Sequence, residues 1–308
     1  MSIRIEARNL TKRYGETRAV DDLTFTVEPG SVTGFLGPNG AGKTTTMRMI
    51  LGLDAPTSGS VTVGGRRYAD LPSPMRVVGA LLDARAVHPG RTAYDHLLCL
   101  AQTNNLPSRR IDEVLATVGL TEVARRRAGR FSLGMSQRLG IAAALLGDPP
   151  VLMFDEPVNG LDPEGIRWIR QLIRGFAAEG RTVLVSSHLM SEMALTADRL
   201  VVIGAGRLIA DRWLDDVIGP DDVRGVRVRA ADPDAVAALL TTSGGLVTPE
   251  PDGSLLVTGL DGARIGALTA RHALPLSELI PQRPSLEEAF MELTRDSVQF
   301  AARDGGDR

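Results

Sequence analysis

The segment that most constrains this chain is the eight-residue run GPNGAGKT at residues 37–44, which fits the pattern G-x-x-x-x-G-K-[ST]. We expect an apolar strand before it, over residues 31–36, and a helix after it. Its glycines allow a tight turn that points backbone N–H groups inward, and the helix N-terminus adds a partial charge of about +0.5. Such a loop binds phosphate oxygens. We expect Lys43 to reach the β- and γ-phosphates of a nucleoside triphosphate and the Thr44 hydroxyl to bind Mg²⁺.

A second motif consists of two adjacent carboxylates, Asp155 and Glu156, directly after the apolar residues 151–154. We expect residues 151–154 to form a strand beside the phosphate-loop strand, with the carboxylates at its C-terminal end, where ligands bind in open α/β sheets. Asp155 would hold Mg²⁺ directly or through water. Glu156 would act as general base on the attacking water, a role worth about 10²–10⁴ in rate. Two acidic residues at a strand end can also be a solvated terminus, but the upstream loop favours the catalytic interpretation.

The alternation of expected strands and helices predicts an α/β fold with a largely parallel sheet covered on both faces. Residues 3–27 predict short strands around a turn, which gives an antiparallel N-terminal β subdomain. Residues 84–147 predict a mainly helical insertion. We therefore expect one domain over residues 1–214.

The composition changes after Trp213, and residues 215–225 are acidic and contain glycine and proline, which predicts a linker. The following strand and helix patterns have the order βαββαβ, which predicts a small α+β domain of the split-βαβ type over residues 226–296. That range includes a final helix at residues 285–294. We expect residues 297–308 to be a disordered tail.

Composition and charge exclude several classes of protein. The net charge of -2 creates no basic field that would attract nucleic acid. Cys99 is the only cysteine, so no intrachain disulfide can form. Residues 1–8 do not resemble a signal peptide, and no apolar run approaches the roughly 20 residues of a spanning helix. The sequence predicts a chain that does not itself cross a membrane.

With these motifs in this order, the chain resembles the ATP-binding subunit of an ATP-binding cassette (ABC) transporter over about residues 3–214. FSLGMSQR at residues 131–138 occupies the family's signature segment, and NGLD at residues 159–162 resembles the loop that meets the partner subunit. Tyr14 stands where the family places an aromatic residue that stacks on adenine. His188 resembles the switch histidine that contacts the γ-phosphate. A turn tyrosine and a structural histidine are the alternatives.

The resemblance implies a head-to-tail dimer in which one phosphate loop and the partner's signature segment hold each nucleotide. Ser132 can cap a helix whose N–H groups then face phosphate. Asp162 precedes Pro163, so it can also be an ordinary helix N-cap. A single cassette implies a homodimer, or a pair with a second cassette protein. The family also implies a separate integral membrane permease and a peripheral position on the cytoplasmic face of the membrane.

Two departures from the family pattern bear on hydrolysis. The usual signature Leu-Ser-Gly-Gly-Gln is Phe-Ser-Leu-Gly-Met here. A left-handed conformation at Leu133 would cost about 1–2 kcal/mol. Asp83 replaces the usual glutamine; it is shorter and, when ionised, cannot donate a hydrogen bond. We expect Asp83 to reach the metal only through water, with slow or partner-dependent hydrolysis.

These departures, and PSLEEAFMELT at residues 284–294, resemble the branch of the family that exports drugs and peptide antibiotics. The sequence thus predicts the ATPase subunit of an exporter that does not act on nucleic acid. The alternatives are a soluble ABC ATPase of translation or DNA repair, and a regulatory module that binds ATP with little turnover. The expected catalytic residues are Glu156, His188 and Asp83, and the expected Mg²⁺ ligands are Thr44, Asp155 and Asp83. The expected nucleotide-binding residues are Tyr14, Gly37, Pro38, Asn39, Gly40, Ala41, Gly42, Lys43, Thr44, Thr45, Ser132, Gly134 and Asp162.

Overall fold

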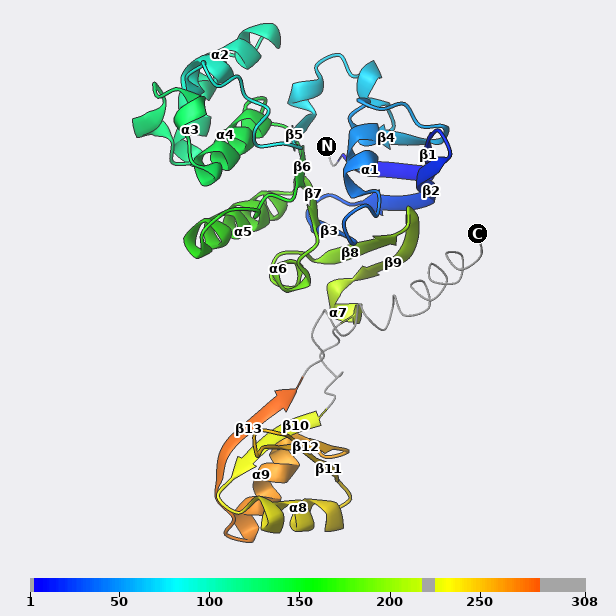
Figure 1. The fold of residues 1–308 in the computed structure, drawn as a ribbon, viewed down its shortest axis with the longest axis vertical. Helices are drawn as coiled ribbons and strands as arrows, with labels where there is room; N and C mark the ends of the chain where they lie inside the picture. Colours follow the sequence, from blue (N-terminus) through cyan, green and yellow to red (C-terminus); the bar gives the residue numbers. More distant parts are fainter. Residues whose placement is uncertain (1–2, 218–224, 283–308) are drawn as a thin grey trace. The chain divides into compact units, whose positions relative to one another are not determined.

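The computed structural model describes residues 3–217 and 225–282, and the chain divides into two compact units on either side of Leu214 (Figure 1). The first unit contains the phosphate loop, and the second contains the predicted βαββαβ segment. The final helix expected at residues 285–294 and the tail expected at residues 297–308 lie outside the described residues. Of the linker expected at residues 215–225, the first three residues belong to helix α7 (Leu214–Val217), and residues 218–224 are not described.

A six-stranded sheet forms the centre of the first unit, with the strand order β5-β6-β7-β3-β8-β9. Its first five strands are parallel and β9 is antiparallel to β8, so the prediction of a largely parallel sheet is confirmed. The strands are β5 (Val78–Leu81), β6 (Val151–Asp155), β7 (Thr182–Ser187), β3 (Val32–Leu36), β8 (Arg199–Gly204) and β9 (Arg207–Trp213).

The expectation that the acidic strand lies beside the phosphate-loop strand is wrong. Strand β7 lies between them and pairs with both, through Val32↔Val183 on one side and Val151↔Thr182 on the other. All six residues of β7 are buried, which suits a central place in the sheet. Crossover connections carry the chain from one parallel strand to the next, so sequence order does not set strand order.

An antiparallel three-stranded sheet, with the order β2-β1-β4, packs against the six-stranded sheet together with helix α1. Phe25 and Phe35 stack across this junction with their ring centroids 5.3 Å apart. Figure 1 shows α1 and α5 on opposite sides of the six-stranded sheet, so both of its faces are covered. These elements are β1 (Ile5–Tyr14), β2 (Thr17–Val27), β4 (Ser58–Val63), α1 (Lys43–Ile50) and α5 (Pro163–Ala178).

Residues 84–147 hold the α-helices α2 (Ala93–Thr103), α3 (Arg109–Thr117) and α4 (Leu133–Leu145), all of them described, and no named strand. The predicted helical insertion is therefore confirmed. Thr92 caps α2 by accepting a hydrogen bond from the Asp95 N–H at 3.0 Å. Helix α6 (Met190–Ala194) follows β7 directly. No helix within the described ranges combines the length and the apolar character that a bilayer span requires.

The second unit has a four-stranded antiparallel sheet with the order β11-β12-β10-β13. Because β12 lies between β10 and β11, the predicted split-βαβ arrangement is confirmed. Val226 and Val228 point into a core shared with Val236 of α8 and Ile265 of α9. The elements are β10 (Gly225–Ala230), α8 (Pro233–Thr242), β11 (Leu246–Pro249), β12 (Leu255–Thr258), α9 (Gly262–Arg271) and β13 (Leu276–Gln282).

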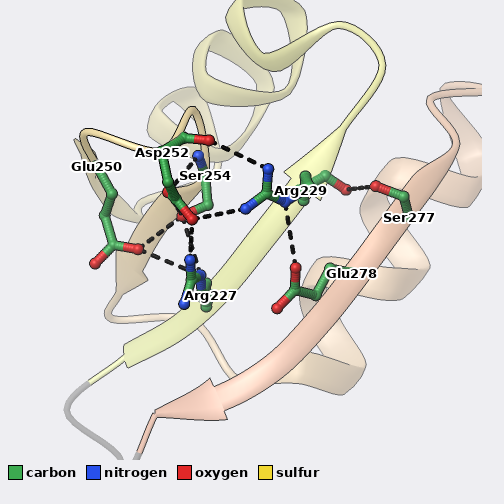
Figure 2. Close-up of polar contacts among 7 residues, drawn as sticks. All are labelled: Arg227, Arg229, Glu250, Asp252, Ser254, Ser277 and Glu278. Atoms are coloured by element: carbon green, nitrogen blue, oxygen red, sulfur yellow. Dashed lines mark hydrogen bonds and ion pairs between the residues drawn. The ribbon is translucent and has the colours of Figure 1, made fainter.

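A charged network lies on the opposite face of this sheet, because Arg227 and Arg229 alternate with the buried valines of β10 (Figure 2). Both guanidinium groups pair with Asp252, and Arg229 Nη2 lies 2.6 Å from Asp252 Oδ2. Hydrogen bonds from the Ser254 hydroxyl and N–H hold the pKa of Asp252 well below its usual range, and the two arginine charges lower it further. The network joins the β11–β12 turn to β10.

We predict that Asp252→Asn lowers the melting temperature of the second unit at pH 7, measured by calorimetry on the full chain. A carboxylate with a lowered pKa stabilises the fold above its unfolded pKa and loses that contribution as the pH falls. The difference from the wild-type protein should therefore narrow below pH 3.8, the ordinary aspartate pKa. Asp234→Asn, an exposed site on α8, is the control and should have little effect. Equal effects of the two variants would contradict this role for the network.

Candidate functional site

A cavity of about 200 Å³ lies at the N-terminus of α1, at the carboxyl edge of the six-stranded sheet. The phosphate loop forms one wall and the acidic pair another. Gly42 is the N-cap of α1 with φ 102°, and a Cβ atom there would lie 2.5 Å from the Ala19 carbonyl oxygen, so only glycine fits. The cavity is lined by Ala19, Pro38, Asn39, Gly40, Gly42, Lys43, Thr44, Thr45, Asp155 and Glu156.

Lys43 is the cation of this cavity, and it is only 6% exposed. Its Nζ donates to the Gly37 carbonyl at 2.6 Å and lies 3.6 Å from Glu156 Oε1. The other carboxylate oxygen, Glu156 Oε2, lies 2.9 Å from His188 Nδ1. Glu156 therefore stands between an ammonium group and an imidazole, and His188 Nε2 is not used in this contact.

The phosphate loop and the acidic strand are connected by a short chain of hydrogen bonds. The Thr44 hydroxyl donates to Asp155 Oδ2 at 2.6 Å. The Ser186 hydroxyl donates to Asp155 Oδ1 and accepts from the Glu156 N–H at 2.9 Å. Ser186 is the register partner of Asp155 across β6 and β7. Sequence reasoning missed Ser186 because it placed the acidic strand directly beside the phosphate-loop strand, with no strand between them in the sheet.

Gln137, on α4, is a further residue that sequence reasoning did not assign to the site. Its side-chain amide is buried and donates to the Pro157 carbonyl at 2.8 Å. Glu156 has φ 49°, a left-handed conformation that is uncommon for a residue other than glycine. Gln137 thus fixes the backbone of Pro157, which directly follows this strained residue. Its place in FSLGMSQR was a signal, but nothing in that pattern identified its backbone partner.

Tyr14 lies at the end of β1, outside the cavity wall, and its side chain is 48% exposed. Its hydroxyl donates to Asp54 Oδ2 at 2.9 Å, and Lys12 Nζ lies 4.9 Å from the centre of its ring. The guanidinium of Arg48, on α1, holds the pKa of Asp54 below its ordinary value. The ring is thus tied to the phosphate-loop helix through Asp54, and stacking on adenine stays a prediction.

The signature segment begins helix α4. The Ser132 hydroxyl accepts a hydrogen bond from the Met135 N–H at 3.2 Å, so the predicted N-cap is confirmed. Leu133 is the first helical residue, and it is not among the described residues with a positive φ. The expected strain at Leu133 is therefore wrong, because the N-cap at Ser132 makes the turn into the helix. Gly134 follows Leu133 in the first turn of α4.

The loop at residues 159–162 packs on the signature segment. A Cβ atom at Gly160, where φ is 74°, would lie 1.9 Å from Leu133 Cδ2, and a Cβ atom at Gly134 would lie 3.3 Å from Leu161. Asp162 caps α5 by accepting a hydrogen bond from the Gly165 N–H at 2.8 Å. Its contact with a partner subunit stays a prediction. Leu133 thus fills the space over Gly160 and ties the two segments together.

Asp83 lies apart from the other candidate residues. It is exposed, and its Oδ1 accepts a hydrogen bond from the Arg85 N–H at 2.8 Å. It is not one of the residues that line the phosphate-loop cavity. The carboxylate therefore stabilises its own turn after β5, and its approach to a metal stays a prediction.

The residues of the cavity fit a Mg²⁺–triphosphate. The cavity wall combines the N-terminus of α1 with a buried ammonium group, and these bind anionic oxygens. The hydroxyl of Thr44 and the carboxylate of Asp155 lie together, and both are oxygen donors of the kind that Mg²⁺ prefers. Phosphate would therefore bind to N–H and ammonium groups, and Mg²⁺ would bind to oxygen ligands beside them.

Two family models match the chain. Residues 20–159 match the model described as ABC transporter, and residues 224–287 match a domain of unknown function. The chain is 43% identical over 214 residues to the bacitracin transport ATP-binding protein BcrA of Bacillus licheniformis, covering 68% of this chain and 70% of that protein. It is 34% identical over 298 residues to the daunorubicin resistance ATP-binding protein DrrA3 of Streptomyces coeruleorubidus, covering 92% and 94%.

Solved structures agree with this likeness. An ATP-binding subunit of an ABC transporter superposes with a TM-score of 0.63 at 30% identity, covering 69% of this chain and 91% of that one. The dimeric ATP-binding cassette MJ0796, in a post-hydrolysis state bound to ADP and phosphate, gives a TM-score of 0.62 at 26% identity, covering 68% and 98%.

We predict that Gly160→Ala lowers the free energy of unfolding by about 2–4 kcal/mol, measured by chemical denaturation. The left-handed backbone costs about 1–2 kcal/mol for alanine, and the overlap with Leu133 adds about 1–2 kcal/mol. In a Leu133→Ala background the overlap is absent. There, Gly160→Ala should lower the free energy of unfolding by only about 1–2 kcal/mol relative to Leu133→Ala alone, which is the cost of the left-handed backbone.

Gly175→Ala is the matched control, because Gly175 lies inside α5 and a Cβ atom added there would have no atom within 4 Å. This variant should be more stable than the wild-type protein by about 0.5–1 kcal/mol. A Gly160→Ala protein as stable as the wild type would show that Leu133 does not hold this loop.

Proposed function

Since the chain belongs to the family of ABC transporter ATP-binding proteins and is an ATPase of that type, we propose that it powers a membrane exporter of drugs or peptide antibiotics. In this proposal it works as a homodimer with a separate integral membrane permease, on the cytoplasmic face of the membrane. The observation that carries the proposal is the position of Glu156 between Lys43 and His188, at the wall of the phosphate-loop cavity.

The loop and Lys43 bind the triphosphate. Backbone N–H groups at the start of α1 and the Lys43 ammonium group contact the phosphate oxygens, and burial of Lys43 strengthens that attraction. Thr44 and Asp155 would hold Mg²⁺, which neutralises phosphate charge when bound. The hydrogen bond of 2.6 Å between Thr44 and Asp155 supports this role, because the two oxygen atoms lie side by side at the cavity.

Glu156 accepts the proton of the attacking water in this proposal. Lys43 and His188 flank its two carboxylate oxygens, so its carboxylate is held in one orientation. His188 uses Nδ1 toward Glu156 and leaves Nε2 for the γ-phosphate. Tyr14 offers an exposed ring for the adenine, with Lys12 near its ring centre. Asp83 is assigned to water-mediated contact with the metal only.

The signature segment is assigned to the nucleotide of the partner subunit. Ser132 and Gly134 lie at the N-terminus of α4, where unpaired N–H groups attract phosphate. Asp162 lies in the loop that packs against Leu133, so both segments can meet the same partner. The dimer recorded for the MJ0796 cassette, bound to ADP and phosphate, supports a two-subunit assembly.

A hollow of about 340 Å³ offers a docking site for the proposed membrane partner. It lies between the turn at residues 84–89 and residues 128–139, and its lining includes Arg85, Phe131 and Leu139. The hollow therefore joins the turn after β5 with helix α4, which carries the signature segment. A permease segment seated there would contact both at once, so its movement would reach the hydrolytic site. The names of the bacitracin and daunorubicin relatives support drugs or peptide antibiotics as cargo.

We predict that Glu156→Gln keeps Mg-ATP affinity within about threefold and lowers hydrolysis by about 10²–10⁴-fold, measured by phosphate release. Glutamine keeps the side-chain length but cannot accept the proton. ATP should then accumulate in a stable dimer, seen as a doubling of mass by light scattering.

Glu179→Gln is the matched control, because it removes an exposed carboxylate at the far end of α5. It should leave both hydrolysis and mass unchanged. Turnover of Glu156→Gln at the wild-type rate would refute Glu156 as the base. A monomer in saturating Mg-ATP would refute the sandwich dimer, and stimulation of the wild-type ATPase by DNA or ribosomes would favour the nucleic-acid alternative.

A further inference from the structure

We infer that Ser186 is a positioning residue for both carboxylates of the site: its hydroxyl sets the orientation of Asp155 toward the metal and holds the main chain of Glu156. The inference rests on the proposed role of Asp155 as a Mg²⁺ ligand. Ser186 lies at the carboxyl end of β7, opposite Asp155 of β6 in the register of the sheet.

The hydrogen bonds of Ser186 use its hydroxyl in two ways. The hydroxyl donates to Asp155 Oδ1 and accepts from the Glu156 N–H at 2.9 Å. A serine hydroxyl has one donor and two acceptor lone pairs, so both bonds form together. The donor can serve only one carboxylate, and it serves the one assigned to the metal.

The consequence for Asp155 is a fixed carboxylate plane. Its Oδ1 is held by Ser186, and its Oδ2 is held by Thr44 at 2.6 Å, so rotation about the last side-chain bond would break both contacts. Asp155 is 9% exposed and Ser186 is 0% exposed. Because bulk water does not reach Ser186, loss of its hydroxyl would leave Oδ1 without that donor in a largely buried place. Partners that orient a metal ligand typically change metal affinity by about 10–100-fold.

The consequence for Glu156 is a fixed backbone. Glu156 has φ 49°, and its N–H donates to the Ser186 hydroxyl. Residues in sparsely populated backbone regions persist only where their surroundings over-determine them. The same hydroxyl therefore holds the residue that carries the proposed base, although Ser186 itself does not touch the substrate.

Ser187 offers a matched comparison within the same strand. It is also 0% exposed, but its hydroxyl accepts from the Leu189 N–H at 2.9 Å and contacts neither carboxylate. Replacing either serine with alanine removes one buried hydroxyl from β7. Only the Ser186 substitution removes a partner of Asp155.

The test measures metal binding apart from turnover. Full-length protein is saturated with a non-hydrolysable ATP analogue, and Mn²⁺ affinity is measured by electron paramagnetic resonance. In Ser186→Ala we expect Mn²⁺ to bind about 10–100-fold more weakly, while analogue affinity in a metal chelator stays within about twofold of wild type. In Ser187→Ala we expect Mn²⁺ affinity within about threefold of wild type. Asp155→Ala is the third arm and should lose Mn²⁺ affinity.

The outcomes separate this inference from the proposed function. Wild-type Mn²⁺ affinity in Ser186→Ala, with weak binding in Asp155→Ala, would overturn the inference and leave Asp155 as a ligand. Wild-type affinity in both would overturn the metal assignment itself. An equal loss in the two serine variants would reduce Ser186 to a packing residue. If Ser186→Ala does not fold, Ser186→Cys keeps the volume with a weak donor and is judged by the same criteria.

Discussion

The hydrogen bond from Thr44 to Asp155 at 2.6 Å is the contact on which the site depends, because it joins two segments 111 residues apart. Thr44 belongs to helix α1, which follows β3 and the phosphate loop. Asp155 ends strand β6, which lies two positions from β3 in the sheet. Because β3 and β6 both run parallel to β7, their carboxyl ends lie at the same edge of the sheet, and the two residues can meet there. Covering layers on both faces bury the strands and keep that edge in register.

Much of the site could be predicted because its chemistry is local in sequence. The phosphate loop and the pair Asp155–Glu156 are each continuous, and each lies where one strand ends. The order of strands could not be predicted, because parallel strands separated by helices can pair in more than one order. The inserted β7 is therefore also the part that sequence reasoning failed to place, and it contributes Ser186 and precedes His188. Hydroxyl partners of this kind follow from register, which no local motif records.

The signature segment is a second place where a tertiary contact could not be predicted from the local sequence. Its departure at Leu133 suggested backbone strain, because the comparison was made with a glycine-containing pattern. The structure instead places Leu133 in the first turn of α4, where its side chain lies over Gly160. A side chain in the signature and a missing side chain in the neighbouring loop thus compensate each other. The second unit was predicted in element order and arrangement because its strands are short and antiparallel, and its helices have clear N-caps.

In the proposed function, Lys43 and the loop around it bind the triphosphate. This binding is measured by calorimetric titration of Lys43→Met with a non-hydrolysable Mg-ATP analogue, since methionine keeps an unbranched apolar side chain and removes the ammonium group. We expect binding about 10–100-fold weaker than in the wild-type protein, from the loss of charged hydrogen bonds of about 1.5–3 kcal/mol. Affinity equal to that of the wild-type protein would show that Lys43 does not bind the triphosphate.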